Sequence, residues 1–282
     1  MAPHPALGGR SAQATHRSTL RVTSLVTDQG IIHYEAYGRG RPVILLHGWM
    51  ESWSVWRQTI EALGKEFRTY ALDFWGFGES VGTSYTVDTY VEMVNQFLDR
   101  LGIVKAPLVG HSMGGTVSLS TAMRYPEKVV KVAVIGSPIH GSSLNVLLKL
   151  SGIPAIAALL FRMPPLLSFF TLLGGYLTTP RAGYQFYRQV RAEMSQVSMH
   201  SFFQSIGTLR RTDLRPHLSK VRPPTLGIYG KWDFIVHPNQ AKALQKGVPH
   251  AKTLLYPDAG HLPMMDTPDR LIRDIREFLL AK

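Results

Sequence analysis

The chain has 282 residues, of which 45% are hydrophobic, and its mean hydropathy of −0.01 excludes both an intrinsically disordered chain and a multi-span membrane protein. The absence of cysteine excludes disulfides, thiolate metal sites and a cysteine nucleophile. The net charge is +12 and the isoelectric point about 10.0, but Lys and Arg are spread along the chain without a nucleic-acid-binding motif, so we expect no nucleic-acid partner.

The first twenty residues differ in composition from the rest. They are rich in Ala, Ser, Thr, Gly and Pro, carry Arg10 and Arg17, and include no acidic residue. The segment lacks the continuous apolar core of a secretory signal, and its Arg and Ser content is similar to that of an organellar transit segment. We therefore predict a flexible basic extension over residues 1–20 and a cytoplasmic protein, with organellar targeting and peripheral membrane attachment as alternatives.

The rest of the chain alternates strand-like apolar runs with helical segments. Arg41 to Leu46 is nearly all apolar, as a strand buried on both faces should be. The expected elements are strands at 30–37, 41–46, 69–72, 106–109, 129–135, 225–229 and 253–256, and helices at 54–63 (capped by Ser54), 87–101, 116–124 and from Pro268 onward. This alternation predicts an α/β fold with a mostly parallel, twisted sheet and helices on both faces.

The most informative stretch is Gly110-His111-Ser112-Met113-Gly114, which directly follows a predicted strand. A serine at the tip of a strand takes a strained backbone conformation, and small residues two positions away on each side let the turn close. Because a predicted helix follows, the backbone N–H of Met113 would face an oxyanion at a helix N-terminus. The pattern indicates a nucleophilic serine.

Two later segments offer the partners that a serine nucleophile needs. The strand-like run at 225–229 leads to Asp233, and the run at 253–256 leads to His261. An imidazole would take the proton of Ser112, and a carboxylate would fix the tautomer of that imidazole. Both residues follow a strand's carboxyl end, the edge at which open α/β sheets bind ligands. Asp258 is a rival acid, because it lies three residues before His261.

In these motifs the chain resembles the α/β-hydrolases, the serine-hydrolase group that includes esterases, lactonases and carbon–carbon bond hydrolases. The stretch ending Leu46-His47-Gly48-Trp49 matches the family's oxyanion loop, so the resemblance implies an oxyanion hole made by the N–H groups of Trp49 and Met113. It favours Asp233 over Asp258 as the triad acid. The family's Asp-x-x-Gly-x-Gly-x-Ser loop is present at residues 73–80, where Asp73 is expected to anchor a turn.

Between residues 138 and 216 the strand and helix alternation stops, and the sequence resembles the helical cap that the family inserts above the catalytic edge. We therefore predict a core at residues 21–137 and 217–282 and a cap at 138–216. Met163 to Pro180 has no charged residue, and its prolines and glycines are expected to break it into short helices. The cap should line an apolar acyl pocket, contact a lipid surface weakly, or do both. Candidate pocket residues are His47, His111, Phe169 and Phe170.

The residues and the resemblance together predict a serine hydrolase that cleaves apolar carboxylic esters or lactones through an acyl-enzyme. No ligand cluster of metal-site spacing, phosphate loop or dinucleotide fingerprint occurs, so we expect no cofactor and no metal. The expected partner is a small apolar acyl substrate. Carbon–carbon bond hydrolysis, acyl transfer and perhydrolysis would use the same groups, and a non-catalytic ligand- or lipid-binding protein on this scaffold is the alternative of another class.

Overall fold

The structure is a computed structural model, and it describes residues 23–146, 153, 164–194 and 197–281. It does not describe the side chains of residues 164–168, 170 and 171. The extension predicted over residues 1–20 lies outside the described residues. So do residues 147–152 and 154–163 of the predicted cap, and the division of the chain at residues 138 and 216 stays a prediction.

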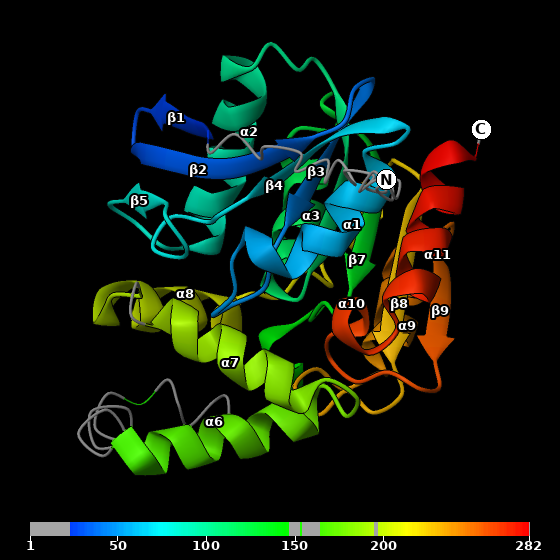
Figure 1. Cartoon of the computed structure of the whole chain (residues 1–282). Coiled ribbons are helices and arrows are strands. Elements are labelled where there is room, and N and C mark those ends of the chain that lie inside the picture. The colour runs from blue at the N-terminus through cyan, green and yellow to red at the C-terminus, as the bar shows by residue number, and fades with distance from the viewer. Residues whose placement is uncertain (1–22, 147–152, 154–163, 195–196, 282) are drawn as a thin grey trace, which may run out of the picture.

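One twisted nine-stranded sheet lies at the centre of the described part (Figure 1). Its strands are β1 (Thr23–Thr27), β2 (Gly30–Tyr37), β3 (Arg41–Leu46), β4 (Phe67–Leu72), β5 (Val81–Gly82), β6 (Ala106–His111), β7 (Val129–Ile135), β8 (Thr225–Gly230) and β9 (Lys252–Tyr256). The order across the sheet is β1-β2-β4-β3-β6-β7-β8-β9, with β5 on β2. All pairs from β4 to β9 are parallel, whereas β1, β2 and β5 pair antiparallel at one edge. The predicted mostly parallel sheet is confirmed.

Helices cover both faces of the sheet (Figure 1). They are α1 (Arg57–Leu63), α2 (Val87–Arg100), α3 (Met113–Arg124), α6 (Pro164–Thr178), α7 (Gly183–Glu193), α8 (Met199–Arg211), α9 (Gln240–Gly247), α10 (Pro263–Asp266) and α11 (Pro268–Leu280). Short 3-10 helices lie at Trp53–Trp56, Gly141–Ser143 and Leu218–Lys220. One core joins α2, α3 and α9 to the sheet, and a second joins α1 and α11 to its other face. Strand β3 contributes alternate residues to the two cores, as expected for a strand buried on both faces.

The first helix after β3 begins earlier than predicted. Ser52, not Ser54, is the capping residue, because the Ser52 hydroxyl accepts a hydrogen bond from the Ser54 N–H at 3.2 Å. A 3-10 turn at Trp53–Trp56 comes first, and α1 continues from it. Serine is a favourable N-cap residue at either position, so the path of the chain after β3 decides which of the two serines caps the helix.

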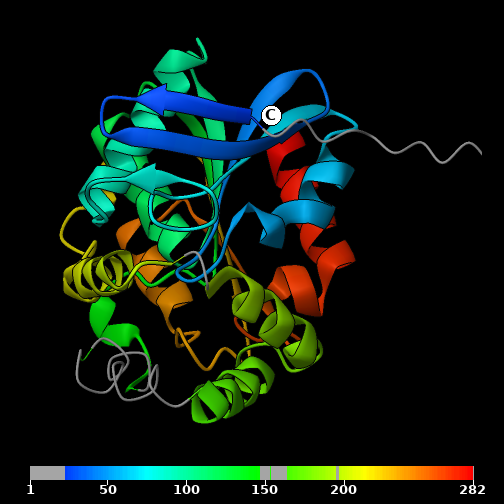
Figure 2. The same cartoon turned by 60° about the vertical axis from the view of Figure 1, so that its left-hand side comes forward.

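Helices α6, α7 and α8 follow β7 in the chain and lie beside the carboxyl ends of the parallel strands (Figure 2). The expectation that Gly174 and Gly175 interrupt α6 is wrong, because α6 continues through both to Thr178. Gly175 contacts the next helix closely: a Cβ there would lie 2.6 Å from the Gly183 carbonyl oxygen. The glycine serves helix packing rather than helix termination. None of the described helices is long and apolar enough to span a membrane.

The two adjacent glycines of α6 should respond oppositely to substitution. A Cβ at Gly174 meets nothing within 4 Å, so Gly174→Ala should raise the unfolding free energy by about 0.5–1 kcal/mol through helix propensity. Gly175→Ala should lower it, because a backbone oxygen of Gly183 must move to make room. Denaturant unfolding of the two variants measures both effects, and equal stabilisation by both would contradict the close contact between α6 and α7.

Candidate active site

Ser112 occupies a sharp turn between β6 and α3. Its backbone has φ 48° and ψ −114°, a positive φ that non-glycine residues adopt only under strain, and its N–H donates to the Ile135 carbonyl at 2.8 Å. Gly110 and Gly114 make the turn possible, since a Cβ at Gly110 would lie 2.3 Å from the Gly114 carbonyl oxygen. The buried serine therefore lies at the start of a helix and at the carboxyl edge of the sheet.

Asp233 and His261 form a buried pair across the loops that follow β8 and β9. The Asp233 Oδ2 lies 2.8 Å from the His261 Nδ1, and the Asp233 Oδ1 accepts from the N–H groups of Ile235 and Val236 at 2.9 and 2.7 Å. The carboxylate is held from both sides. It orients the imidazole so that Nε2 is the ring nitrogen left to exchange a proton.

The residue next to Ser112 links this turn to the His261 loop. The His111 Nε2 donates to the His261 carbonyl oxygen at 2.8 Å, and the two imidazole centroids are 4.7 Å apart. Within the described part of the chain, the Ser112 hydroxyl has no hydrogen-bond partner. Asp258, the rival acid, instead pairs with Arg181 at 3.4 Å and Arg270 at 3.5 Å on the surface.

The two backbone groups predicted to form an oxyanion hole come from separate loops. Met113 opens α3, and Trp49 lies in the loop after β3. Neither N–H donates to a protein acceptor among the described residues, so both are available to an anionic oxygen. The Trp49 indole donates to the Ser205 hydroxyl of α8 at 3.1 Å and lies 4.7 Å from the Phe202 ring. Helix α8 thus covers the loop with an aromatic pair.

A buried ion pair lies beneath these loops. The Glu51 Oε2 accepts from the Gly48 N–H at 2.6 Å and from the His111 Nδ1 at 3.0 Å. Burial disfavours the charged form of both side chains, but the charge and hydrogen bond of the partner have the larger combined effect. The pKa of the Glu51 carboxyl is therefore lowered, and the pKa of the His111 imidazole is raised. Both ring nitrogens of His111 face acceptors, which favours the imidazolium. Sequence reasoning missed Glu51, because nothing in a loop glutamate signals its buried partner.

His47 and His111, which are predicted to line the substrate pocket, are fully buried in this structure, and their contact with a substrate stays a prediction. His47 is fully buried, its Nε2 accepts from the Phe74 N–H at 2.9 Å, and its Nδ1 donates to the Gly48 carbonyl at 2.6 Å. Burial lowers the pKa of His47 and keeps it neutral. The ring nitrogens of both histidines form hydrogen bonds with backbone groups or with Glu51, and these bonds stabilise the loops.

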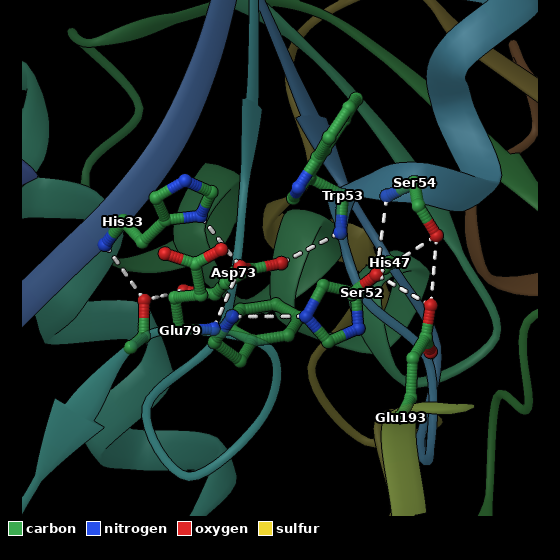
Figure 3. A network of polar contacts seen from close by, with 10 residues as sticks. His33, His47, Ser52, Trp53, Ser54, Asp73, Glu79 and Glu193 are labelled. Carbon is green, nitrogen blue, oxygen red and sulfur yellow. Dashed lines mark hydrogen bonds and ion pairs between the residues drawn. The ribbon is translucent and has the colours of Figure 1, made fainter. Parts of the chain in front are cut away.

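Asp73 anchors the neighbouring loops from within (Figure 3). Its buried carboxylate accepts from the Trp53 N–H at 2.6 Å and the Glu79 N–H at 3.1 Å, and it pairs with the His33 Nδ1 at 2.7 Å. Burial acts to lower the pKa of His33, but the Asp73 hydrogen bond and charge raise it overall. The turn-anchoring role expected for Asp73 is confirmed.

Glu193 joins helix α7 to the loop after β3. Its Oε1 accepts from the hydroxyls of Ser52 and Ser54, each at 2.7 Å (Figure 3). It also accepts from the Gln189 amide at 3.2 Å. Its Oε2 is buried with no hydrogen-bond partner among the described atoms. Burial raises the pKa of this carboxyl, against the three hydrogen bonds. The sequence offered no signal for this link.

The remaining pocket candidates lie on α6. Phe169 is 60% exposed, and its place in the substrate pocket stays a prediction. The Phe170 side chain lies outside the described residues. Within the described ranges, no three His, Asp or Glu side chains gather in a group that could hold a metal ion.

The chain is similar to known proteins over most of its length. A family model for the α/β hydrolase fold matches residues 41–268. A pimeloyl-(acyl-carrier protein) methyl ester esterase of Vibrio campbellii is 26% identical over 88% of this chain and 98% of its own. A bifunctional epoxide hydrolase 2 of Sus scrofa is 27% identical over 88% of this chain and 53% of its own. An enol-lactonase structure from Burkholderia xenovorans superposes with a TM-score of 0.78 at 20% identity, covering 92% of this chain and 100% of that one.

The chain belongs to the α/β-hydrolase fold family. It is a hydrolase, since the family model matches most of its length and its relatives include proteins named as esterases.

Glu51→Gln should destabilise the protein most at mildly acidic pH. The raised pKa of His111 contributes stability that is full below its ordinary value of 6.5 and is lost as pH rises through the raised value. The lowered pKa of Glu51 contributes stability that is present above 4.5 and is lost as pH falls through the lowered value. The loss on substitution should be about 1–3 kcal/mol near pH 6 and smaller near pH 9.

Denaturant unfolding at the two pH values measures this difference. The exposed Glu61 of α1 supplies the control, since Glu61→Gln should change the unfolding free energy little at either pH. Equal losses for Glu51→Gln at pH 6 and pH 9 would show that the ion pair is not the source of the effect.

Proposed function

We propose that this hydrolase cleaves carboxylic esters with apolar acyl groups, using Ser112 as nucleophile, His261 as general base and acid, and Asp233 as the carboxylate that orients His261. The observation that carries the proposal is the buried 2.8 Å contact between Asp233 and the His261 Nδ1, beside the strained turn of Ser112. A pair so held provides the oriented base that a serine hydroxyl needs.

In this mechanism the Ser112 Oγ bonds to the acyl carbon while its proton passes to the His261 Nε2. The negative charge that develops on the carbonyl oxygen is stabilised by the N–H groups of Trp49 and Met113. Collapse of the intermediate breaks the ester bond, and the imidazolium gives its proton to the leaving alcohol. A water molecule, deprotonated by the same imidazole, then releases the acid and restores the serine.

The epoxide hydrolase named among the relatives suggests a second reaction class. The family resemblance implies an aspartate at the nucleophile position of epoxide hydrolases, whereas this chain has Ser112 there. A carboxylate can form an ester by opening an epoxide, whereas a serine hydroxyl is suited to acyl carbonyls. The serine therefore favours acyl chemistry.

Within acyl chemistry, ester hydrolysis is favoured because relatives that match over nearly their whole length are named as methyl ester esterases. Carbon–carbon bond hydrolysis, acyl transfer and perhydrolysis would use the same three residues and differ in the leaving group or acceptor. A non-catalytic binding protein would have no need for the strained serine or the buried acid and histidine pair.

Fluorophosphonate labelling tests the proposal directly. Wild-type protein should be labelled at Ser112 and should hydrolyse p-nitrophenyl esters. Ser112→Ala should lose both labelling and turnover, by on the order of 10⁴- to 10⁶-fold in rate, with an unchanged circular dichroism spectrum. An unlabelled but folded wild-type protein would favour the binding protein instead.

The two aspartates near His261 provide the matched comparison within the same test. Asp233→Asn should lower turnover by roughly 10³- to 10⁴-fold, because the imidazole loses the carboxylate that holds its tautomer. Asp258→Asn removes surface pairs with Arg181 and Arg270 and should cost about tenfold or less. The reverse ranking would move the acid to Asp258.

The acyl preference should follow from the aromatic cover of the oxyanion loop. The Trp49 and Phe202 rings pack 4.7 Å apart at the oxyanion loop, and each methylene of an acyl group buried against them would contribute up to about 0.8 kcal/mol. The kcat/KM for p-nitrophenyl esters should therefore rise from acetyl to hexanoyl by up to roughly a hundredfold. The acetyl ester serves as the internal control, and a profile that peaks at acetyl would contradict an apolar acyl site.

A further inference from the structure

The outer face of helix α6 exposes apolar side chains in a row. Phe169, Leu173, Tyr176 and Leu177 are 60%, 46%, 52% and 39% exposed. Their spacing of four, seven and eight residues from Phe169 places them on one side of the helix. Gly175 contacts α7, and the Tyr176 ring, although half exposed, also lies beside Gly183 of that helix. We call these four residues the apolar face; α6 lies outermost beside α7 in both views (Figure 1, Figure 2).

Exposed basic residues lie on the turn and the helix that follow the apolar face in the chain. Arg181 lies in the turn after α6, and Arg188 and Arg191 lie on the exposed side of α7, where they line an open depression together with Tyr184 and Tyr187. Arg181 pairs with Asp258, but neither Arg188 nor Arg191 pairs with an acidic side chain in the described part of the chain. We call Arg181, Arg188 and Arg191 the arginine border; they give the turn after α6 and the exposed side of α7 a positive charge.

The part of the chain that contains α6 and α7 has a large excess of basic residues over acidic ones. From Lys128 to Ala192 the sequence has no Asp or Glu, and residues 138–216 hold eight Lys or Arg residues against two acidic ones. One of those two acids, Glu193, is turned inward onto Ser52 and Ser54. A surface formed here carries positive charge with little to neutralise it.

We propose that the apolar face and its arginine border dock on the surface of an anionic lipid bilayer. Aromatic and aliphatic side chains enter the boundary between headgroups and acyl chains, and arginines beside them bind lipid phosphates. Tyr176 and Tyr184 suit this position, because tyrosine places its ring in the apolar layer and its hydroxyl in the polar one. An acidic protein would match the arginines but would leave four adjacent apolar side chains to water.

The docking face is tied to the active site by hydrogen bonds at the end of α6. The Thr178 carbonyl accepts from the His261 N–H at 2.5 Å. The Thr179 hydroxyl and the Arg181 N–H donate to the Asp266 Oδ1 at 2.6 and 3.0 Å, while the Gly260 N–H donates to the Asp266 Oδ2 at 2.8 Å. Docking would hold the His261 loop next to the bilayer, where apolar esters partition.

Vesicle sedimentation tests the docking without any measurement of turnover, so its result is independent of the proposed hydrolysis. The probes are phosphatidylcholine vesicles and vesicles in which about a third of the lipid is phosphatidylglycerol, at ionic strengths of about 10 mM and 500 mM. The full chain should bind the anionic vesicles at low ionic strength and be released at high ionic strength. Ser112→Ala should bind equally well.

Two variants separate the charged and apolar contributions. Arg188→Glu with Arg191→Glu should lower partitioning into anionic vesicles at least tenfold, since each basic residue near the surface is worth about fivefold. Leu173→Asp should lower it by about tenfold or more. The controls are Val104→Asp and Lys105→Glu. Val104 is an apolar residue that is 80% exposed, and Lys105 is an exposed basic residue. Both lie just before β6, at the opposite end of the strands. Neither control should change binding.

Three results would overturn the proposal. Wild-type protein that stays in the supernatant with anionic vesicles at low ionic strength does not dock. If these two variants and the two controls lose vesicle binding equally, then the chain binds through another surface or through its net charge alone. Elution of the wild-type chain as a dimer that Leu173→Asp dissociates would make the apolar face an interface between two copies.

Discussion

The buried ion pair between Glu51 and His111 joins the three loops on which the candidate site depends. Glu51 binds the Gly48 N–H in the oxyanion loop, His111 precedes Ser112, and the second ring nitrogen of His111 binds the carbonyl of His261. Loops after β3, β6 and β9 are thereby fixed to one another through two side chains. Loss of either charge would leave the other buried without a partner, at a large cost in free energy. The pair therefore holds the loops in a single arrangement.

Buried carboxylates perform a similar task around the whole carboxyl edge of the sheet. Asp73 binds the N–H groups of two loops, Asp233 binds two N–H groups in the loop after β8, and Asp266 binds Gly260 and Arg181. A carboxylate accepts several hydrogen bonds at once, so one side chain can satisfy loop backbone groups that have no strand partner. In a chain of net charge +12, several of the few acids are thus used inside, and the cap surface is left basic.

Helices α6 and α7 are attached to the loops at the carboxyl edge of the sheet at two places with different chemistry. Glu193 of α7 binds Ser52 and Ser54, and the end of α6 binds His261 and Asp266. Between these attachments α8 covers Trp49 with Phe202. In the proposed reaction, the acyl group of a substrate would meet apolar side chains of these helices, while the reacting carbonyl would meet backbone N–H groups of the loops after β3 and β6.

The sequence by itself determined the parts whose causes are local. Apolar runs marked the central strands, and the residues around Ser112 required a sharp turn because only glycines fit at Gly110 and Gly114. Ser112, Asp233 and His261 follow the ends of three predicted parallel strands, and this placed them at one edge, since parallel strands end at the same side. Only the tertiary structure decided which serine caps α1, how α6 passes through two glycines, and that Glu51 and Glu193 are internal anchors. Those outcomes depend on contacts between residues far apart in the chain, such as the 60 positions between Glu51 and His111, and no local pattern records such a contact.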